Sequence, residues 1–152
     1  MKYIVFDIDG VLADCSHRLK YIKGEKKDYE KFYSYNEVVM DRIIQDGKKL
    51  LESIELALDS MDNTDIVFIT ARNEKCYGAT EAWLVSNLGA YHEMFMRSKN
   101  DWRPAHEVKE DLIKKHIGFE NILFAFDDDD KINEMYAKHG VMCYKPNITR
   151  SK

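Results

Sequence analysis

Two aspartates lie two residues apart, directly after a short apolar run near the start of the sequence. The run covers residues 3–6, and Asp7-Ile8-Asp9-Gly10 follows it. Because alternate residues of an extended segment point the same way, both carboxylates can face one site. Gly10 permits a tight turn away from that site. Two close carboxylates repel each other unless a cation or a proton lies between them. This spacing therefore predicts acid–base or metal chemistry at the end of a first strand.

A hydroxyl, two cations and more acids are placed near other apolar runs, far along the chain. They are Thr70 and Arg72 at the end of residues 65–70, Lys109 before residues 122–126, and Asp127 and Asp128 after them. In doubly wound folds, ligands bind where the carboxyl ends of parallel strands meet. Hard oxygen ligands with open positions favour Mg²⁺, and Lys109 and Arg72 can neutralise an anionic substrate. These groups are what phosphoryl transfer needs, namely positioning and charge stabilisation.

Short apolar runs alternate with amphipathic segments along the chain. The predicted strands are residues 3–6, 65–70, 93–96, 122–126 and 141–144, and the predicted helices are 38–60, 79–88, 107–117 and 131–139. Strands that are apolar on both faces suit a parallel sheet covered by helices. The last three predicted helices each end at a glycine, as C-caps often do. The alternation predicts an α/β fold with a doubly wound, mostly parallel five-stranded sheet.

Residues 16–36 break this alternation because they are rich in Lys, Tyr and Glu. We expect them to form a small insertion over one end of the sheet, with a short helix at residues 28–34. The insertion carries an aromatic group that either packs internally or forms part of a base-stacking lid. Its members are Tyr29, Phe32, Tyr33 and Tyr35. The basic tail at residues 145–152 is expected to fray.

Composition narrows the class of protein. A chain of 152 residues fits one domain, residues 1–152. The formal net charge of −4 argues against a nucleic-acid coat protein or a polybasic membrane binder. Three cysteines without a CxxC pair suggest neither a disulfide framework nor a thiolate zinc site. No apolar run approaches the roughly 18 residues of a membrane span, and the first run is too short for a signal-peptide core. We therefore expect a cytoplasmic protein.

The residues after the first run resemble the first motif of the haloacid dehalogenase-like (HAD) phosphohydrolases. The matching stretch is Phe6-Asp7-Ile8-Asp9-Gly10-Val11-Leu12, with Val11 where the superfamily usually has Thr. Thr70, Lys109 and the pair Asp127-Asp128 look like the second, third and fourth motifs, in the family's order. The resemblance implies a Rossmann-like core with a minimal cap and Mg²⁺-dependent hydrolysis of phosphomonoesters. It also implies that Asp7 attacks phosphorus to form an aspartyl-phosphate, and that Asp9 acts as general acid and base.

The resemblance also implies roles for the other motif residues. The metal ligands would be Asp7, the backbone carbonyl of Asp9, and Asp127 or Asp128. Thr70 and the backbone N–H of Ile8 would hold the phosphoryl oxygens. Lys109 would hold Asp7 and the phosphoryl group together electrostatically.

A narrower resemblance is to the phosphatase domain of bacteriophage-type polynucleotide kinase. It rests on His17-Arg18, residues 69–72, residues 108–110 with 115–117, residues 126–128, and Glu134-Met135. It implies removal of a 3′-phosphate from a nucleic-acid end, with Arg18, Ala71 and Arg72 at the substrate. No GxxxxGK[ST] loop occurs, so a separate kinase or ligase would be the partner. It leaves open a phage-encoded protein acting in a host cytoplasm.

One departure concerns the acid that relatives carry four positions before the third-motif lysine. Ala105 stands at that position here. Either Asp101 takes the place of this acid, or the contact that it makes is lost.

Three other functions would also suit an α/β fold with acids at its strand ends. A phosphatase of nucleotides or other small molecules would use the same machinery, and the net charge of −4 favours it slightly. The short insertion cannot enclose a substrate fully, which instead suits a polymer end. A phosphoacceptor receiver domain needs its acceptor after the third strand, but Arg97-Ser98 follows residues 93–96. A catalytically inactive binding module is disfavoured because every motif residue needed for turnover is present.

Overall fold

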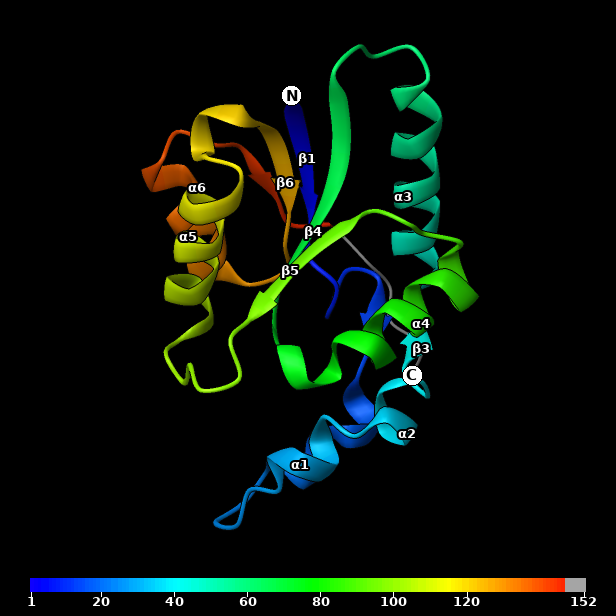
Figure 1. Ribbon diagram of the computed structural model, residues 1–152, viewed down its shortest axis with the longest axis vertical. Helices are drawn as coiled ribbons and strands as arrows, with labels where there is room; N and C mark the ends of the chain where they lie inside the picture. Colours follow the sequence, from blue (N-terminus) through cyan, green and yellow to red (C-terminus); the bar gives the residue numbers. More distant parts are fainter. Residues whose placement is uncertain (147–152) are drawn as a thin grey trace.

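A five-stranded sheet forms the centre of the structure, a computed structural model that describes residues 1–146 (Figure 1). Its strand order is β5-β4-β1-β6-β7, and every neighbouring pair is parallel. The strands are β1 (Lys2–Phe6), β4 (Thr64–Asn73), β5 (Glu93–Arg97), β6 (Ile122–Phe126) and β7 (Cys143–Tyr144). The chain builds outward from β1 first on one side and then on the other. This topology confirms the predicted doubly wound fold and brings the carboxyl ends of β1 and β6 together.

Helices cover both faces of this sheet (Figure 1). One core contains side chains from α3 (Gln45–Leu58) and α4 (Tyr77–Leu88), and the other contains side chains from α5 (Ala105–His116) and α6 (Asp130–Lys138). Along β1, Ile4 and Phe6 enter the first core, whereas Val5 enters the second. The strands are therefore apolar on both faces because each face is covered. Within residues 1–146, no helix has the length and apolar character needed to cross a bilayer.

The predicted helix at residues 38–60 is wrong in its first third. The structure instead has α2 (Tyr35–Val38), a short strand β3 (Arg42–Ile43), and then α3. Strand β3 pairs antiparallel with β2 (Ala13–Asp14). The helical spacing of Val39, Ile43 and Ile44 is coincidental. Val39 packs against the first core from a turn and Ile43 from strand β3, whereas Ile44 is buried at the N-cap of α3.

An insertion follows the first strand and extends beyond residues 16–36. It contains a 3₁₀ helix at Ser16–Tyr21, α1 (Tyr29–Phe32) and α2, and the β2–β3 pair closes it. Helix α1 lies inside the predicted helix at residues 28–34. Of the tail that was expected to fray, residues 147–152 lie outside the described part of the chain.

Helix α3 lies directly on the loop that follows Asp9. The Ile44 N–H donates to the Leu12 carbonyl over 2.8 Å, and Gly47 is buried in the first turn of the helix. A Cβ atom at Gly47 would overlap the carbonyl group of Val11. Gly47 therefore allows a backbone approach that fixes the loop beside the first motif.

This contact gives a stability prediction. Gly47→Ala should lower the free energy of unfolding by about 1–3 kcal/mol, because backbone must move to accept the methyl group. Gly78 in α4 has open space around its Cα, so Gly78→Ala should leave stability unchanged or raise it by up to about 1 kcal/mol. Urea unfolding of both variants makes the comparison. Equal stability of the two would show that α3 does not need this close approach.

Candidate active site

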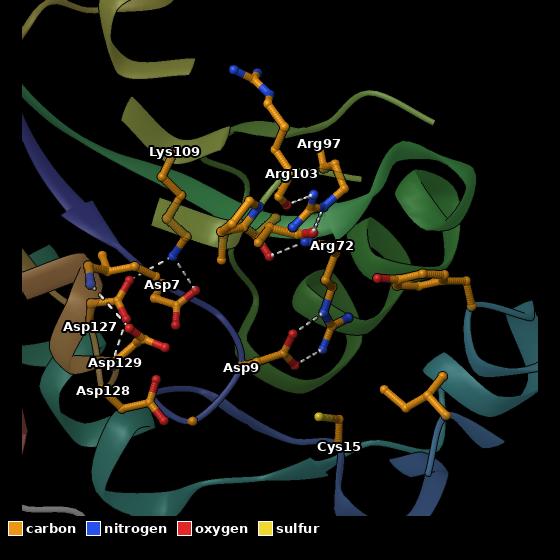
Figure 2. Close-up of a pocket in the computed structure, with 18 of the residues that line it drawn as sticks. Asp7, Asp9, Cys15, Arg72, Arg97, Arg103, Lys109, Asp127, Asp128 and Asp129 are labelled. Carbon is orange, nitrogen blue, oxygen red and sulfur yellow. Dashed lines mark hydrogen bonds and ion pairs between the residues drawn. The ribbon is translucent and has the colours of Figure 1, made fainter. Parts of the chain in front are cut away.

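A buried lysine joins the ends of two neighbouring strands. Lys109 comes from α5 and is 1% exposed. Its Nζ donates to Asp7 Oδ1 over 2.8 Å and to Asp127 Oδ2 over 2.7 Å (Figure 2). Asp7 follows β1 and Asp127 follows β6, and the Asp7 N–H donates to the Phe126 carbonyl. The sheet register thus sets the distance between the two acids that Lys109 bridges.

Asp128 adds a third carboxylate to this pair. One carboxylate oxygen each from Asp7, Asp127 and Asp128 lies within 4.8 Å of the others. Asp129, the next residue, instead caps α6 by accepting from the Ile132 N–H. Three carboxylates around one ammonium group leave an excess of negative charge. These oxygens are of the kind that Mg²⁺ prefers, so the donor set fits that ion.

The pKa values of the site follow from this crowding. Burial raises the pKa of Asp7 well above its usual value, and the nearby Asp127 carboxylate adds to the rise, while Lys109 opposes both. Burial alone would lower the pKa of Lys109, yet Asp127 and Asp7 hold it above its ordinary value. Lys109 therefore stays protonated, and the negative charge of the three carboxylates is only partly compensated.

Asp9 points away from this cluster and binds an arginine (Figure 2). Arg72 Nη2 donates to Asp9 Oδ1 over 2.7 Å and Arg72 Nε to Asp9 Oδ2 over 3.1 Å. Burial would raise the pKa of Asp9, but Arg72 and then Arg18 bring it below its usual value. The Asp9 side chain keeps 36% of its surface exposed. Its carboxylate is thus held in one orientation and remains open to the cavity.

Asp41 is a site-supporting residue that the sequence analysis missed. It lies between α2 and β3, and its carboxylate is fully buried. It accepts from Arg18 Nε over 2.7 Å, from Arg18 Nη2 over 2.9 Å and from Arg72 Nη2 over 2.7 Å. His17 Nε2 lies 2.9 Å from the same carboxylate. Asp41 thus ties the insertion to the arginine that orients Asp9. The only signal for it in the sequence was one acid within the apolar stretch at residues 38–44.

Most predicted site residues line one cavity of about 530 Å³. They are Asp7, Asp9, Thr70, Ala71, Arg72, Lys109, Asp127 and Asp128. Thr70 Oγ1 accepts from the Arg72 N–H, which fixes this strand end. The Ile8 side chain is buried, and its carbonyl accepts from the N–H groups of the following turn.

Arg18 does not lie where a substrate-facing cation was expected. It is completely buried, and its guanidinium donates to Asp41 and to the Phe32 carbonyl. Its Nη2 is 4.0 Å from Asp9 Oδ1, so it lies behind Asp9 and outside the cavity lining. The structure therefore corrects the placement of Arg18, because burial needs the carboxylate partner that Asp41 supplies.

Asp101 is engaged with a neighbour on its own loop. Its carboxylate accepts from Arg103 Nε over 3.0 Å and Arg103 Nη2 over 2.8 Å. Lys109 instead binds Asp7 and Asp127. Asp101 thus braces its own loop through Arg103 and does not take over the position of the acid that relatives carry where this chain has Ala105.

Solved structures with a similar fold include chains of RNA repair complexes and a haloacid dehalogenase-like family hydrolase. One chain of the Pnkp1/Rnl/Hen1 RNA repair complex has TM-score 0.72 and 18% identity, covering 95% of this chain and 42% of that one. A chain of a second Pnkp1/Rnl/Hen1 complex has TM-score 0.71 and 19% identity, and the match covers 95% of this chain and 45% of that one. A haloacid dehalogenase-like family hydrolase from Streptococcus pneumoniae has TM-score 0.60 and 12% identity, and the match covers 94% of this chain and 83% of that one. At these identities the likeness shows the fold alone.

A family model then defines the chain more closely. The model of the polynucleotide kinase PNKP phosphatase domain matches residues 1–148, so the chain belongs to that family. The chain spans less than half the length of the two repair-complex chains that it resembles. No curated protein matches its sequence.

The buried network around Asp41 yields a second prediction. Asp41→Asn should lower the free energy of unfolding by about 3 kcal/mol or more, because two buried guanidinium groups lose their shared counter-charge. Asp62→Asn, at an exposed aspartate, should change it by less than about 0.5 kcal/mol. Urea unfolding measures both. If Asp41→Asn lowers the free energy of unfolding no more than Asp62→Asn does, the buried network does not stabilise the fold as described.

Proposed function

We propose that this chain is a Mg²⁺-dependent phosphomonoesterase that removes the 3′-phosphate from a nucleic-acid end through an aspartyl-phosphate. The observation that carries this proposal is the cavity in which Asp7, Lys109 and the acid cluster meet at adjoining strand ends. This cavity supports the proposal because the Asp7 carboxylate lies next to a fixed cation and close to two further carboxylates. Positioning of this kind is the main contribution that proteins make to phosphoryl transfer.

Mg²⁺ would be held by Asp7 and by Asp127 or Asp128, whose carboxylate oxygens converge. When bound, the ion would neutralise charge that develops on the phosphoryl oxygens. The Asp9 carboxylate is engaged by Arg72, so a contribution from Asp9 to the ion would come from its backbone carbonyl.

Asp7 is the proposed nucleophile. Its Oδ1 is fixed by Lys109, and the positive charge of Lys109 favours the ionised form of a carboxylate whose pKa burial raises. In the first step a bond forms between an Asp7 carboxylate oxygen and phosphorus, and the bond from phosphorus to the leaving oxygen breaks. Thr70 and the Ile8 N–H would hold the remaining phosphoryl oxygens. Lys109 would counter the negative charge on the group in transfer.

Asp9 is the proposed general acid and base. Arg72 orients its carboxylate, and the exposed part of Asp9 faces the cavity. Asp9 would give a proton to the leaving oxygen in the first step. In the second step it would take a proton from a water molecule whose oxygen bonds to phosphorus as the bond from phosphorus to the Asp7 oxygen breaks, which releases phosphate and restores Asp7. Arrival of a negatively charged phosphate opposes the effect of Arg72 on Asp9, which favours the protonated form needed for the first step.

Two findings support a nucleic-acid end as the substrate. The family is that of polynucleotide kinase phosphatase domains, and the fold matches chains of RNA repair complexes. The same findings support a separate kinase or ligase as a partner, and action in a cytoplasm where such ends are repaired.

The test is phosphate release in the presence of Mg²⁺. We expect a 3′-phosphorylated oligonucleotide to be hydrolysed at least about tenfold faster than its 5′-phosphorylated twin or 3′- and 5′-mononucleotides. Asp7→Asn should abolish release from every substrate, because the amide is not a comparable nucleophile. A preference for mononucleotides would show that the substrate is a small molecule, while the proposed reaction mechanism would stand. Release that survives Asp7→Asn would overturn the mechanism.

The acid cluster gives a prediction about the metal. Asp128→Asn should raise the Mg²⁺ concentration for half-maximal activity by about tenfold or more, because one charged oxygen ligand is lost. Asp130 is exposed and pairs with Lys145, so Asp130→Asn should leave that concentration unchanged. Chelation of the metal should stop turnover in both. An unchanged requirement in Asp128→Asn would remove Asp128 from the site.

A further inference from the structure

The cavity that contains the acid cluster also has an aromatic wall, which we define as Tyr29, Phe32, Tyr33 and Trp102. The first three belong to α1 and its C-terminal end, and Trp102 belongs to the loop between β5 and α5. The ring centroids of Tyr29 and Trp102 are 5.2 Å apart, and the Tyr29 and Tyr33 rings are stacked with centroids 6.2 Å apart. The wall therefore joins the insertion to the opposite loop.

Trp102 is 61% exposed although it takes part in this wall. The other tryptophan, Trp83, is buried and donates to the Asp41 carbonyl. Aromatic side chains stabilise a fold mainly through the surface that they bury. Much of the Trp102 surface is left available to a ligand, and exposed apolar surface inside a cavity points to a binding function.

The loop that carries Trp102 is braced on both sides. Arg97 Nη1 donates to the carbonyls of Asp101 and Arg103 over 3.0 and 2.6 Å. Arg97 Nε donates to the Ala71 carbonyl over 2.8 Å (Figure 2). Ala71 follows Thr70, which is proposed to hold a phosphoryl oxygen. One guanidinium group therefore fixes Trp102 relative to the proposed phosphate site, and such fixing favours binding by lowering its entropy cost.

The cations of the cavity already have partners. Lys109 binds Asp7 and Asp127, and Arg72 binds Asp9 and Asp41. Arg97 binds backbone carbonyls, and Arg103 pairs with Asp101 and Asp111. These partners occupy several of the N–H donors of the cations, so fewer donors are available to the phosphodiester backbone of a polymer. The exposed aromatic surface is therefore better suited than the cations to hold the part of the substrate next to the phosphate.

We infer that the aromatic wall is a stacking subsite for the nucleobase of the terminal nucleotide that carries the phosphate. This inference rests on the proposed function and deepens it. Every base has a π-face, and stacking on aromatic side chains tolerates any base sequence. The subsite thus selects a phosphate that is attached to a base-bearing nucleoside, with Trp102 as the main contact and Tyr29 as its support.

The experiment compares two oligonucleotides that differ only in their last nucleoside. One carries its 3′-phosphate on a normal nucleoside, and the other carries it on an abasic sugar. The native chain should show a kcat/KM at least about tenfold higher for the normal end, as base stacking of ordinary strength gives. Trp102→Ala should remove this preference by lowering kcat/KM for the normal end alone, and Trp102→Phe should retain part of it.

Tyr91→Ala serves as the matched control, because Tyr91 is 80% exposed and lines a different pocket. It should leave the preference unchanged. Equal kcat/KM for normal and abasic ends in the native chain would overturn the subsite, and so would an equal fall for both ends in Trp102→Ala. No release from either oligonucleotide is a different result, since it would overturn the proposed function itself.

A binding measurement tests the subsite without turnover. In the Asp7→Asn chain, a 3′-phosphorylated nucleotide should quench tryptophan fluorescence through Trp102, and an abasic sugar 3′-phosphate should not. The additional variant Trp102→Phe should lose this quenching, because the remaining Trp83 is buried. The same quenching in the Trp102→Phe chain would overturn the assignment of the base to this wall.

Discussion

The site depends on a shortage of positive charge where β1 and β6 end. Three carboxylates converge there, and the buried Lys109 neutralises only part of their charge. Lys109 lets the two acids that it bridges lie side by side, while the remaining negative charge favours capture of a divalent cation. The parallel register of the two strands and the position of α5 both serve this arrangement. Lys109 also opposes the rise that burial and Asp127 cause in the pKa of Asp7, the proposed nucleophile.

A second ionic network couples the insertion to the same chemistry. Asp41 holds Arg18 and Arg72, and Arg72 in turn orients Asp9. The insertion is thus linked to Asp9, the proposed general acid, through buried ion pairs, and it also supplies most of the aromatic wall. Its small size leaves the cavity open, and its rigid attachment gives the cavity a defined shape. The same short segment is therefore linked both to the proposed general acid and to the proposed base subsite.

The sequence predicted well those parts of the fold in which burial alone determines which residues form a strand. Strands such as β1 and β6 are apolar on both faces, so their ends, and with them Asp7 and Asp127, were found directly. The segment at residues 38–44 was misassigned because Val39, Ile43 and Ile44 mimic a helical spacing, which hid the role of Asp41. Trp102 had no periodic signal, since its place depends on a tertiary contact with Tyr29. Arg18 was found by its motif, but only the structure showed its burial.

Trapping the covalent intermediate tests whether Asp7 is the nucleophile. Reduction of an acyl phosphate by borohydride converts the aspartyl residue into homoserine, and mass spectrometry of peptides from a quenched reaction locates the change. We expect homoserine at position 7 alone, and only when a phosphorylated substrate and Mg²⁺ are both present. Homoserine at another aspartate, or none at position 7 during demonstrated turnover, would contradict the assignment of Asp7 as the nucleophile.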